Sequence, residues 1–280
     1  MRLMEQIRTR RFLRDAATVV GIIIIVFVWW LLTFNDYQHD ARAYWNLDLD
    51  APYVSSVVGG REAYLYSPAF AQLVWPLTLV PWEVFAGVWA ALNLGALVWL
   101  AGPIIGAGLL VIPGSPVIDE VGTGNIHLLM AGAIYAGFRW PGAWAFVILT
   151  KVAPGAGLLY FAGARRWRAL AIGAGLTLAI SAASFLTAPG LWFDWIETLR
   201  NSTDVAIPSE IAIIPGPIWA RTLAASVLAL VGGLVGWRWL VPVAATLALP
   251  VPWSSGLSVL VAVIALWRSG MLTEQRATAS

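Results

Sequence analysis

Long apolar stretches alternate with shorter polar ones along almost the whole chain. The first apolar run covers residues 16–34, which is long enough to cross a bilayer as a helix. The pattern predicts an all-α integral membrane protein with about nine or ten transmembrane helices. The runs that follow the first one lie near residues 69–80, 82–101, 103–118, 122–137, 141–160, 169–187, 218–236, 239–250 and 253–267.

Two longer polar stretches, residues 35–67 and 188–217, interrupt this pattern. The second contains residues 191–197, Leu-Trp-Phe-Asp-Trp-Ile-Glu, whose mixture of aromatic and acidic side chains predicts an amphipathic helix on the membrane surface. We expect both stretches to form loops on the same side of the membrane, with juxtamembrane helices. No repeat and no soluble second domain are evident, so residues 1–280 are interpreted as a single membrane domain.

The N-terminal segment, residues 1–15, is rich in arginine. The apolar run behind it is longer than the core of a signal peptide, which has about 7–15 residues, and it ends in bulky rather than small side chains. We therefore expect an uncleaved first span with a cytoplasmic N-terminus. Eleven arginines then fall on the cytoplasmic side and five on the outer side, as the positive-inside rule requires. This orientation places residues 269–280 in the cytoplasm and both long loops outside a cell membrane.

Composition supports a hydrocarbon environment. The chain has 60% hydrophobic and only 11% charged residues, with a mean hydropathy of +0.78, whereas soluble domains carry about 25% charged residues. A net charge of +2 without a basic stripe argues against a nucleic-acid partner. There are no cysteines and only two histidines, so no cofactor or metal is predicted. Asp36 and Asp40 could together bind a divalent metal, but no pattern indicates one.

Asp36 and Asp40 follow the first apolar run directly and are the first candidates for chemistry. Residues four apart share one face if the segment is helical. A carboxylate at a membrane surface is partly shielded from water and becomes a stronger base, which suits it to remove a proton from a hydroxyl. The alternative is an acidic loop that is simply solvated.

Two cations are also candidates. Lys151 lies within an apolar run, where a lysine costs roughly 2.5–3.5 kcal/mol on insertion scales, so it is either functional or reaches the interface or a carboxylate. Arg221 opens an apolar run just after the second polar stretch. It could bind a phosphate with two parallel hydrogen bonds, or it could merely set the orientation of the chain.

Two further segments carry weaker signals. Tyr64 and Tyr66 precede Pro68, and aromatic residues with a proline at a helix start are common at membrane interfaces. Residues 122–127, Gly-Thr-Gly-Asn-Ile-His, precede a short apolar segment. Glycines there could expose backbone N–H groups to an anion, or they could permit close helix packing.

Taken in order, these residues resemble family 87 of the GT-C class of polytopic glycosyltransferases. The resemblance covers about residues 16–225 and rests on five elements in the family's order. They are Asp40-Ala-Arg-Ala-Tyr44-Trp45; Tyr64, Tyr66 and Pro68, followed by Pro76, Leu77 and Pro81; Gly122, Asn125 and Leu128; Lys151 and Pro154; and the turn from Arg165 to Arg168.

The resemblance implies inverting transfer of a hexose, usually mannose, from a polyprenyl-phosphate donor in the lipid bilayer to a glycolipid or glycan acceptor at the outer face. It assigns the role of base to Asp40, with Asp36 as the second candidate. Cations would stabilise the leaving phosphate, and the candidates are Arg221, Lys151 and Arg42. The expected substrate-binding residues are Tyr44, Tyr64, Tyr66, Asn125 and His127.

The chain departs from the family in two ways. It is shorter than many members, and it has no histidine after His127, although some relatives use one in their C-terminal half. Two other functions therefore stay open at this point. One is a transporter or flippase of lipid-linked sugars, with Lys151 and the glycine-rich segments lining a pathway. The other is a non-catalytic membrane scaffold.

Overall fold

The computed structural model describes residues 2–54, 63–202 and 212–274. Parts of the predicted outer loops (55–62 and 203–211) and the end of the predicted tail (275–280) lie outside the described residues. Within the described ranges the chain forms thirteen α-helices and four 3-10 helices, and the β-pairing there is a single bridge between Trp237 and Thr273. The predicted all-α integral membrane class is confirmed.

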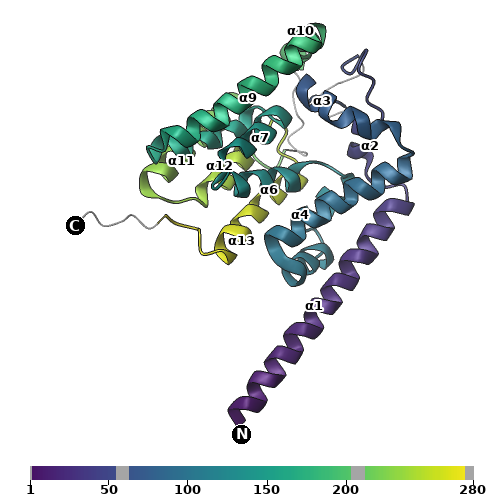
Figure 1. Ribbon diagram of the computed structural model, residues 1–280, viewed down its shortest axis with the longest axis vertical. Coiled ribbons are helices and arrows are strands. Elements are labelled where there is room, and N and C mark those ends of the chain that lie inside the picture. Colours follow the sequence, from purple (N-terminus) through teal and green to yellow (C-terminus); the bar gives the residue numbers. More distant parts are fainter. Residues whose placement is uncertain (1, 55–62, 203–211, 275–280) are drawn as a thin grey trace, which may run out of the picture.

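Helix α1 (Arg2–Phe34) packs along α4 (Trp82–Val111), and its N-terminal part projects well beyond the bundle (Figure 1). Large apolar side chains such as Val19, Ile23 and Phe27 are exposed on α1. Such exposure is unfavourable in water but costs nothing in hydrocarbon, because lipid chains are as apolar as the side chains.

Four helices in the described ranges are long and apolar enough to cross a membrane: Thr9–Phe34 within α1, α4, α9 (Trp167–Thr187) and α11 (Ile218–Val235). This is fewer than the nine or ten predicted. The other apolar runs form shorter helices, because prolines and glycines interrupt them. These helices are α3 (Pro68–Val74), α5 (Pro116–Thr123), α6 (His127–Gly137), α7 (Trp144–Thr150), α8 (Leu159–Gly163), α12 (Leu240–Leu247) and α13 (Val261–Arg268), with η1 (Trp75–Leu79), η2 (Pro141–Ala143), η3 (Ala153–Leu158) and η4 (Ser254–Leu260).

The predicted break between the runs 82–101 and 103–118 is confirmed, because the backbone inside α4 is non-helical at Gly102, just before Pro103, and α4 consists of two helical segments joined at this kink. Gly102 has a φ of 79°, and Pro103 has no N–H to donate to the carbonyl of Trp99. The Arg268 guanidinium donates to the carbonyls of Trp99 and Leu100 instead, at 3.4 and 2.9 Å. The carbonyls freed by the kink therefore find their hydrogen-bond donor in α13.

Three helices gather at the end of the molecule opposite the N-terminus: α2 (His39–Trp45), α3 and α10 (Pro189–Ser202) (Figure 1). Helix α10 confirms that residues 191–197 are helical, and the Trp195 indole N–H donates to the Leu65 carbonyl at 3.1 Å. Below α2 lies an aromatic core, in which the Tyr44 ring packs against the rings of Tyr66, Phe70 and Trp89. This core supports the polar residues described next.

Candidate active site

The start of α2 is anchored to three other elements through Gln38. Its backbone N–H donates to the Gly122 carbonyl at 2.7 Å, and its buried side-chain amide donates to the carbonyls of Leu32 and Ala86. Gln38 has a φ of 62°, so the chain leaves α1 by a sharp turn and enters α2 against the loop between α5 and α6. The position of α2 is therefore set by backbone contacts as well as by apolar packing.

The loop between α5 and α6 approaches α2 closely at Gly124. Gly124 has a φ of 70°, and a Cβ placed there would lie 2.8 Å from the Ala41 Cβ and 3.0 Å from the Gln38 Cβ. Glycine is required both by the left-handed backbone and by the lack of space. The Gly124 carbonyl accepts a hydrogen bond from the Trp89 indole at 2.7 Å. Residues 122–125 thus allow close packing, which was one of the two interpretations of this segment.

Asp40 lies at the centre of the arrangement. One carboxylate oxygen accepts a hydrogen bond from the Asn125 side-chain amide at 2.6 Å, and the other lies 3.4 Å from the His39 Nε2. The Asp40 side chain keeps 31% of its surface exposed, so it is held without being sealed off. A carboxylate oriented in this way can accept a proton from a hydroxyl group placed beside it.

Two phenols continue the network on the buried side of Asn125. The Tyr44 and Tyr66 hydroxyls lie 2.6 Å apart, and the Tyr66 hydroxyl donates to the Asn125 side-chain oxygen at 3.5 Å. Burial raises the pKa of both phenols above their usual value, so they stay neutral at physiological pH. Tyr64 is buried beside them, with its ring centroid 5.4 Å from that of Tyr66. Tyr66, itself bonded to Tyr44, thus fixes the amide that holds Asp40.

Lys151 joins the cluster from the C-terminal end of α7. Its ammonium nitrogen lies 5.7 Å from the centre of the Tyr66 ring, and its charge acts on Asp40, Glu120 and His127. Its side chain is half-buried. The chain thus brings a cation and the Asp40 carboxylate together, although they are more than a hundred residues apart in the sequence.

His127 is fully buried at the start of α6, where it contacts Glu120, a residue that the sequence analysis missed. One Glu120 oxygen accepts hydrogen bonds from the backbone N–H groups of His127 and Leu128, and the other lies 2.8 Å from the His127 Nδ1. The Asn125 side-chain oxygen accepts from the N–H of Ile126, the residue before His127. These N–H groups are therefore already satisfied, so the suggestion that this helix start binds an anion is wrong. The signal for Glu120 was an acidic residue inside an apolar run.

Asp36 and Arg42 form a pair of their own. The Arg42 guanidinium donates to the Asp36 carboxylate at 2.8 Å and lies 4.2 Å above the Trp82 ring, while the Asp36 side chain is 89% exposed. Asp36 precedes α2, which begins at His39. It therefore does not share a helical face with Asp40, as the spacing of four residues had suggested.

Arg221 has different neighbours from the residues around Asp40. It is 5% exposed at the start of α11, and its guanidinium donates to the carbonyls of Gly216, Leu247, Leu249 and Pro250 at 2.6–3.1 Å. These carbonyls come from the segment before α11, from the last residue of α12 and from the segment that follows α12. Binding a phosphate would require Arg221 to give up these bonds, so the structure gives it a role in holding the chain and not the predicted role in the site.

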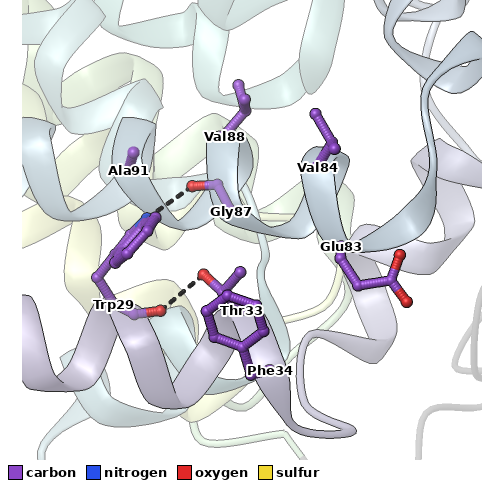
Figure 2. A pocket seen from close by; sticks show the side chains of 8 residues that line it. All are labelled: Trp29, Thr33, Phe34, Glu83, Val84, Gly87, Val88 and Ala91. Atoms are coloured by element: carbon purple, nitrogen blue, oxygen red, sulfur yellow. Dashed lines mark hydrogen bonds between the residues drawn. The ribbon is translucent and has the colours of Figure 1, made fainter.

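An apolar groove of about 410 Å³ lies between α1 and α4 (Figure 2). On one wall the Trp29 indole donates to the Gly87 carbonyl at 2.8 Å, and the Thr33 hydroxyl donates to the Trp29 carbonyl at 2.8 Å. Gln38 is bonded to Leu32 and Ala86, the neighbours of Thr33 and Gly87, so the groove lies close to the start of α2. Its lining consists of Trp29, Thr33, Phe34, Glu83, Val84, Gly87, Val88 and Ala91.

Within the described ranges, no group of three or more acidic, histidine or cysteine side chains is arranged to hold a metal ion. The residues brought together are Asp40, Tyr44, Tyr64, Tyr66, Asn125, His127 and Lys151, with Glu120 beneath them. They come from α2, the segment before α3, α5, the loop between α5 and α6, the start of α6, and the end of α7.

Comparison with known proteins agrees with the resemblance noted in the sequence. The model of glycosyltransferase family 87 matches residues 64–280, which includes Asn125, His127 and Lys151 and begins after Asp40. No curated protein and no solved structure matches the chain. Because the family model matches most of the chain, the protein belongs to glycosyltransferase family 87.

Proposed function

We propose that this glycosyltransferase moves a hexose, most simply mannose, from a polyprenyl-phosphate donor to an acceptor hydroxyl with inversion at the sugar carbon. The observation that carries the proposal is the Asp40 carboxylate, which is oriented by Asn125, remains partly exposed and lies within the electrostatic reach of the Lys151 ammonium. This combination of base and cation suits a single displacement in which phosphate leaves.

In the proposed reaction Asp40 removes the proton from the acceptor hydroxyl as its oxygen attacks the sugar carbon. The bond from that carbon to the phosphate oxygen breaks on the opposite side, and the phosphate leaves as an anion. Lys151 stabilises the developing negative charge, so no general acid is needed. Tyr44, Tyr66 and Asn125 hold Asp40 in position. Arg42, already paired with Asp36, is a second cation at the start of α2.

The groove between α1 and α4 supports a donor that arrives from the lipid. Its lining is mostly apolar, and it lies between two long apolar helices (Figure 2). It is close to the turn that leads to Asp40, because Gln38 is bonded to Leu32 and Ala86, the neighbours of Thr33 and Gly87. The first isoprene units of a polyprenyl chain match such a surface chemically. We therefore propose that the donor's chain lies in this groove and that its phosphate reaches the cluster around Asp40.

The orientation is part of the proposal. The uneven distribution of arginines supports a cytoplasmic N-terminus, and α2, α3 and α10 would then lie at the outer face of a cell membrane. Helix α10 exposes Phe193, Ile196 and Leu199, which suits a helix lying at the interface. A glycolipid or a glycan would then reach Asp40 from the outside.

The test replaces Asp40 with asparagine, which keeps the shape of the side chain and removes the base. We expect Asp40→Asn to reduce transfer from radiolabelled polyprenyl-phosphate mannose into extractable membrane products by about 100- to 10,000-fold. Asp50→Asn, which alters an exposed carboxylate in the same polar stretch, is the matched control and should retain transfer. Wild-type transfer by folded Asp40→Asn protein would contradict the assignment of the base.

A further inference from the structure

Glu120 is a fully buried carboxylate inside an apolar segment, and both of its oxygens have defined partners. One oxygen accepts the two backbone N–H groups at the start of α6, those of His127 and Leu128. The other oxygen is bonded to the His127 imidazole at 2.8 Å. Capping the helix requires only the first oxygen. The bond between the second oxygen and the His127 imidazole therefore needs another explanation.

Glu120 also holds the loop that carries Asn125. Its backbone carbonyl accepts hydrogen bonds from the N–H groups of Gly124 and Asn125, at 3.0 and 3.2 Å. The main chain of Glu120 thus bonds to the start of residues 124–128, and its side chain bonds to their end. Asn125, within this segment, donates to Asp40 at 2.6 Å. The placement of Asp40 therefore depends on Glu120 through a short chain of hydrogen bonds.

The pattern of donors specifies the form of the His127 ring. Two N–H donors at one oxygen favour an ionised carboxylate, which can only accept, so the His127 Nδ1 must carry the proton. Lys151 acts electrostatically on His127, and a second cation beside it would be repelled, so the neutral imidazole fits best. Its buried Nε2 has no hydrogen-bond partner in the described part of the chain and is left as an acceptor.

We propose that Glu120 is a positioning residue of the transferase site: it holds His127 with its proton on Nδ1, which leaves the Nε2 lone pair as an acceptor within the electrostatic reach of the Lys151 charge, and it fixes the loop that aims Asn125 at Asp40. This inference rests on the proposed function for its effect on transfer, but not for the state of His127. With the proton on Nε2 instead, this lone pair would be lost.

The sharpest variant is Glu120→Gln. The glutamine oxygen can still accept the two backbone N–H groups, so the helix start remains capped, while its NH₂ group faces the His127 Nδ1. A donor at that place forces the imidazole proton from Nδ1 to Nε2. Asp119→Asn is the matched control, because it removes the neighbouring carboxylate, which is exposed and bonded to the Ser254 hydroxyl.

The state of the ring is measured by nitrogen NMR on protein labelled only at histidine, in detergent or nanodiscs. The chain has two histidines, and His39→Asn assigns the two sets of signals. We expect His127 to be neutral and protonated on Nδ1 in the wild type and in Asp119→Asn, and on Nε2 in Glu120→Gln. A wild-type His127 protonated on Nε2 would overturn the proposal, and this holds even if Glu120→Gln fails to fold.

Transfer kinetics supply the second measurement, with radiolabelled polyprenyl-phosphate mannose as the donor. We expect Glu120→Gln to lower kcat by about 10- to 100-fold with a much smaller change in KM, because small displacements of catalytic groups reduce rates by such factors. Asp119→Asn should retain kcat. A ring that changes its protonated nitrogen while kcat stays within about twofold of wild type would contradict the positioning role. Absence of transfer by the wild type would count against the proposed donor, and the NMR result would still decide whether Glu120 sets the state of His127.

Discussion

Two buried polar clusters in this protein contain residues that look equally functional in the sequence, yet their surroundings differ. Around Asp40, polar atoms bond to other side chains, and 31% of the Asp40 side chain stays exposed. Around Arg221, the guanidinium bonds within the described ranges are all to backbone carbonyls, and the side chain is 5% exposed. The first cluster has charged and polar groups that can still contact a substrate. In the second cluster, the donors of Arg221 are already bonded to backbone carbonyls and hold the chain in place.

The comparison shows how a buried charge can be interpreted. An arginine that satisfies carbonyls left over at a helix end offsets the cost of burying those carbonyls, and this is a structural task. Asp40 is held by the Asn125 amide and lies 3.4 Å from His39, and it remains partly exposed. The nearby Lys151 is half-buried and has no acidic partner at ion-pair distance in the described part of the chain, so both groups can still interact with a substrate. Three variants test this contrast.

Lys151→Met should have the largest effect of the three. It keeps the apolar stem and removes the positive charge that acts on Asp40 and would stabilise the leaving phosphate. We expect kcat for transfer from polyprenyl-phosphate mannose to fall by about 100- to 1,000-fold. Arg139→Met, which removes an exposed positive charge at the end of α6, is the control. A kcat within twofold of wild type would exclude Lys151 from the reaction.

Arg221→Lys should act on stability and not on chemistry. An ammonium cannot reach four carbonyls spread around a planar guanidinium, so buried acceptors lose their donors, at a cost of about 1–3 kcal/mol in the free energy of unfolding. We expect the thermal unfolding temperature to fall by several degrees, with kcat per folded molecule close to that of the wild type. Arg200→Lys at an exposed position of α10 should leave the unfolding temperature unchanged. A large loss of kcat without destabilisation would instead return Arg221 to the active site.

Val84→Trp should give the smallest effect. The new ring would fill part of the groove between α1 and α4, where we place the donor's isoprene units (Figure 2). We expect KM for the donor to rise about 3- to 10-fold, which corresponds to about 1 kcal/mol, with kcat unchanged. Val111→Trp, at an exposed position near the other end of α4, should leave KM as it is. Equal kinetics for both variants would show that the chain of the donor lies elsewhere.

The membrane class and the members of the site were within reach of the sequence for different reasons. The class follows from local composition, because so many long apolar runs are compatible with the hydrocarbon of a bilayer and not with water. Asp40, Asn125, His127 and Lys151 stood out because polar groups inside or beside apolar runs are costly and need a reason to be there.

The number of long helices could not be deduced in the same way. A proline or glycine within an apolar run either kinks a helix or ends it, and the outcome depends on partners from elsewhere. At Gly102 and Pro103 the helix breaks into two segments joined at a kink, and Arg268 of α13 supplies donors to the freed carbonyls. At Gly124, α5 ends because the left-handed backbone turns the chain against α2.

By itself, the sequence determined that this chain is helical and membrane-embedded. It also determined that a small set of polar residues lies in apolar surroundings, where their burial costs free energy. Each of these conclusions follows from the chemistry of short segments. Only the tertiary structure decided which of those residues work together. It placed Asn125 on Asp40, paired Asp36 with Arg42, surrounded Arg221 with carbonyls and buried Glu120 under His127. The physical reason is that the role of a charged side chain depends on which groups hydrogen-bond to it or neutralise it, and those groups come from distant parts of the chain.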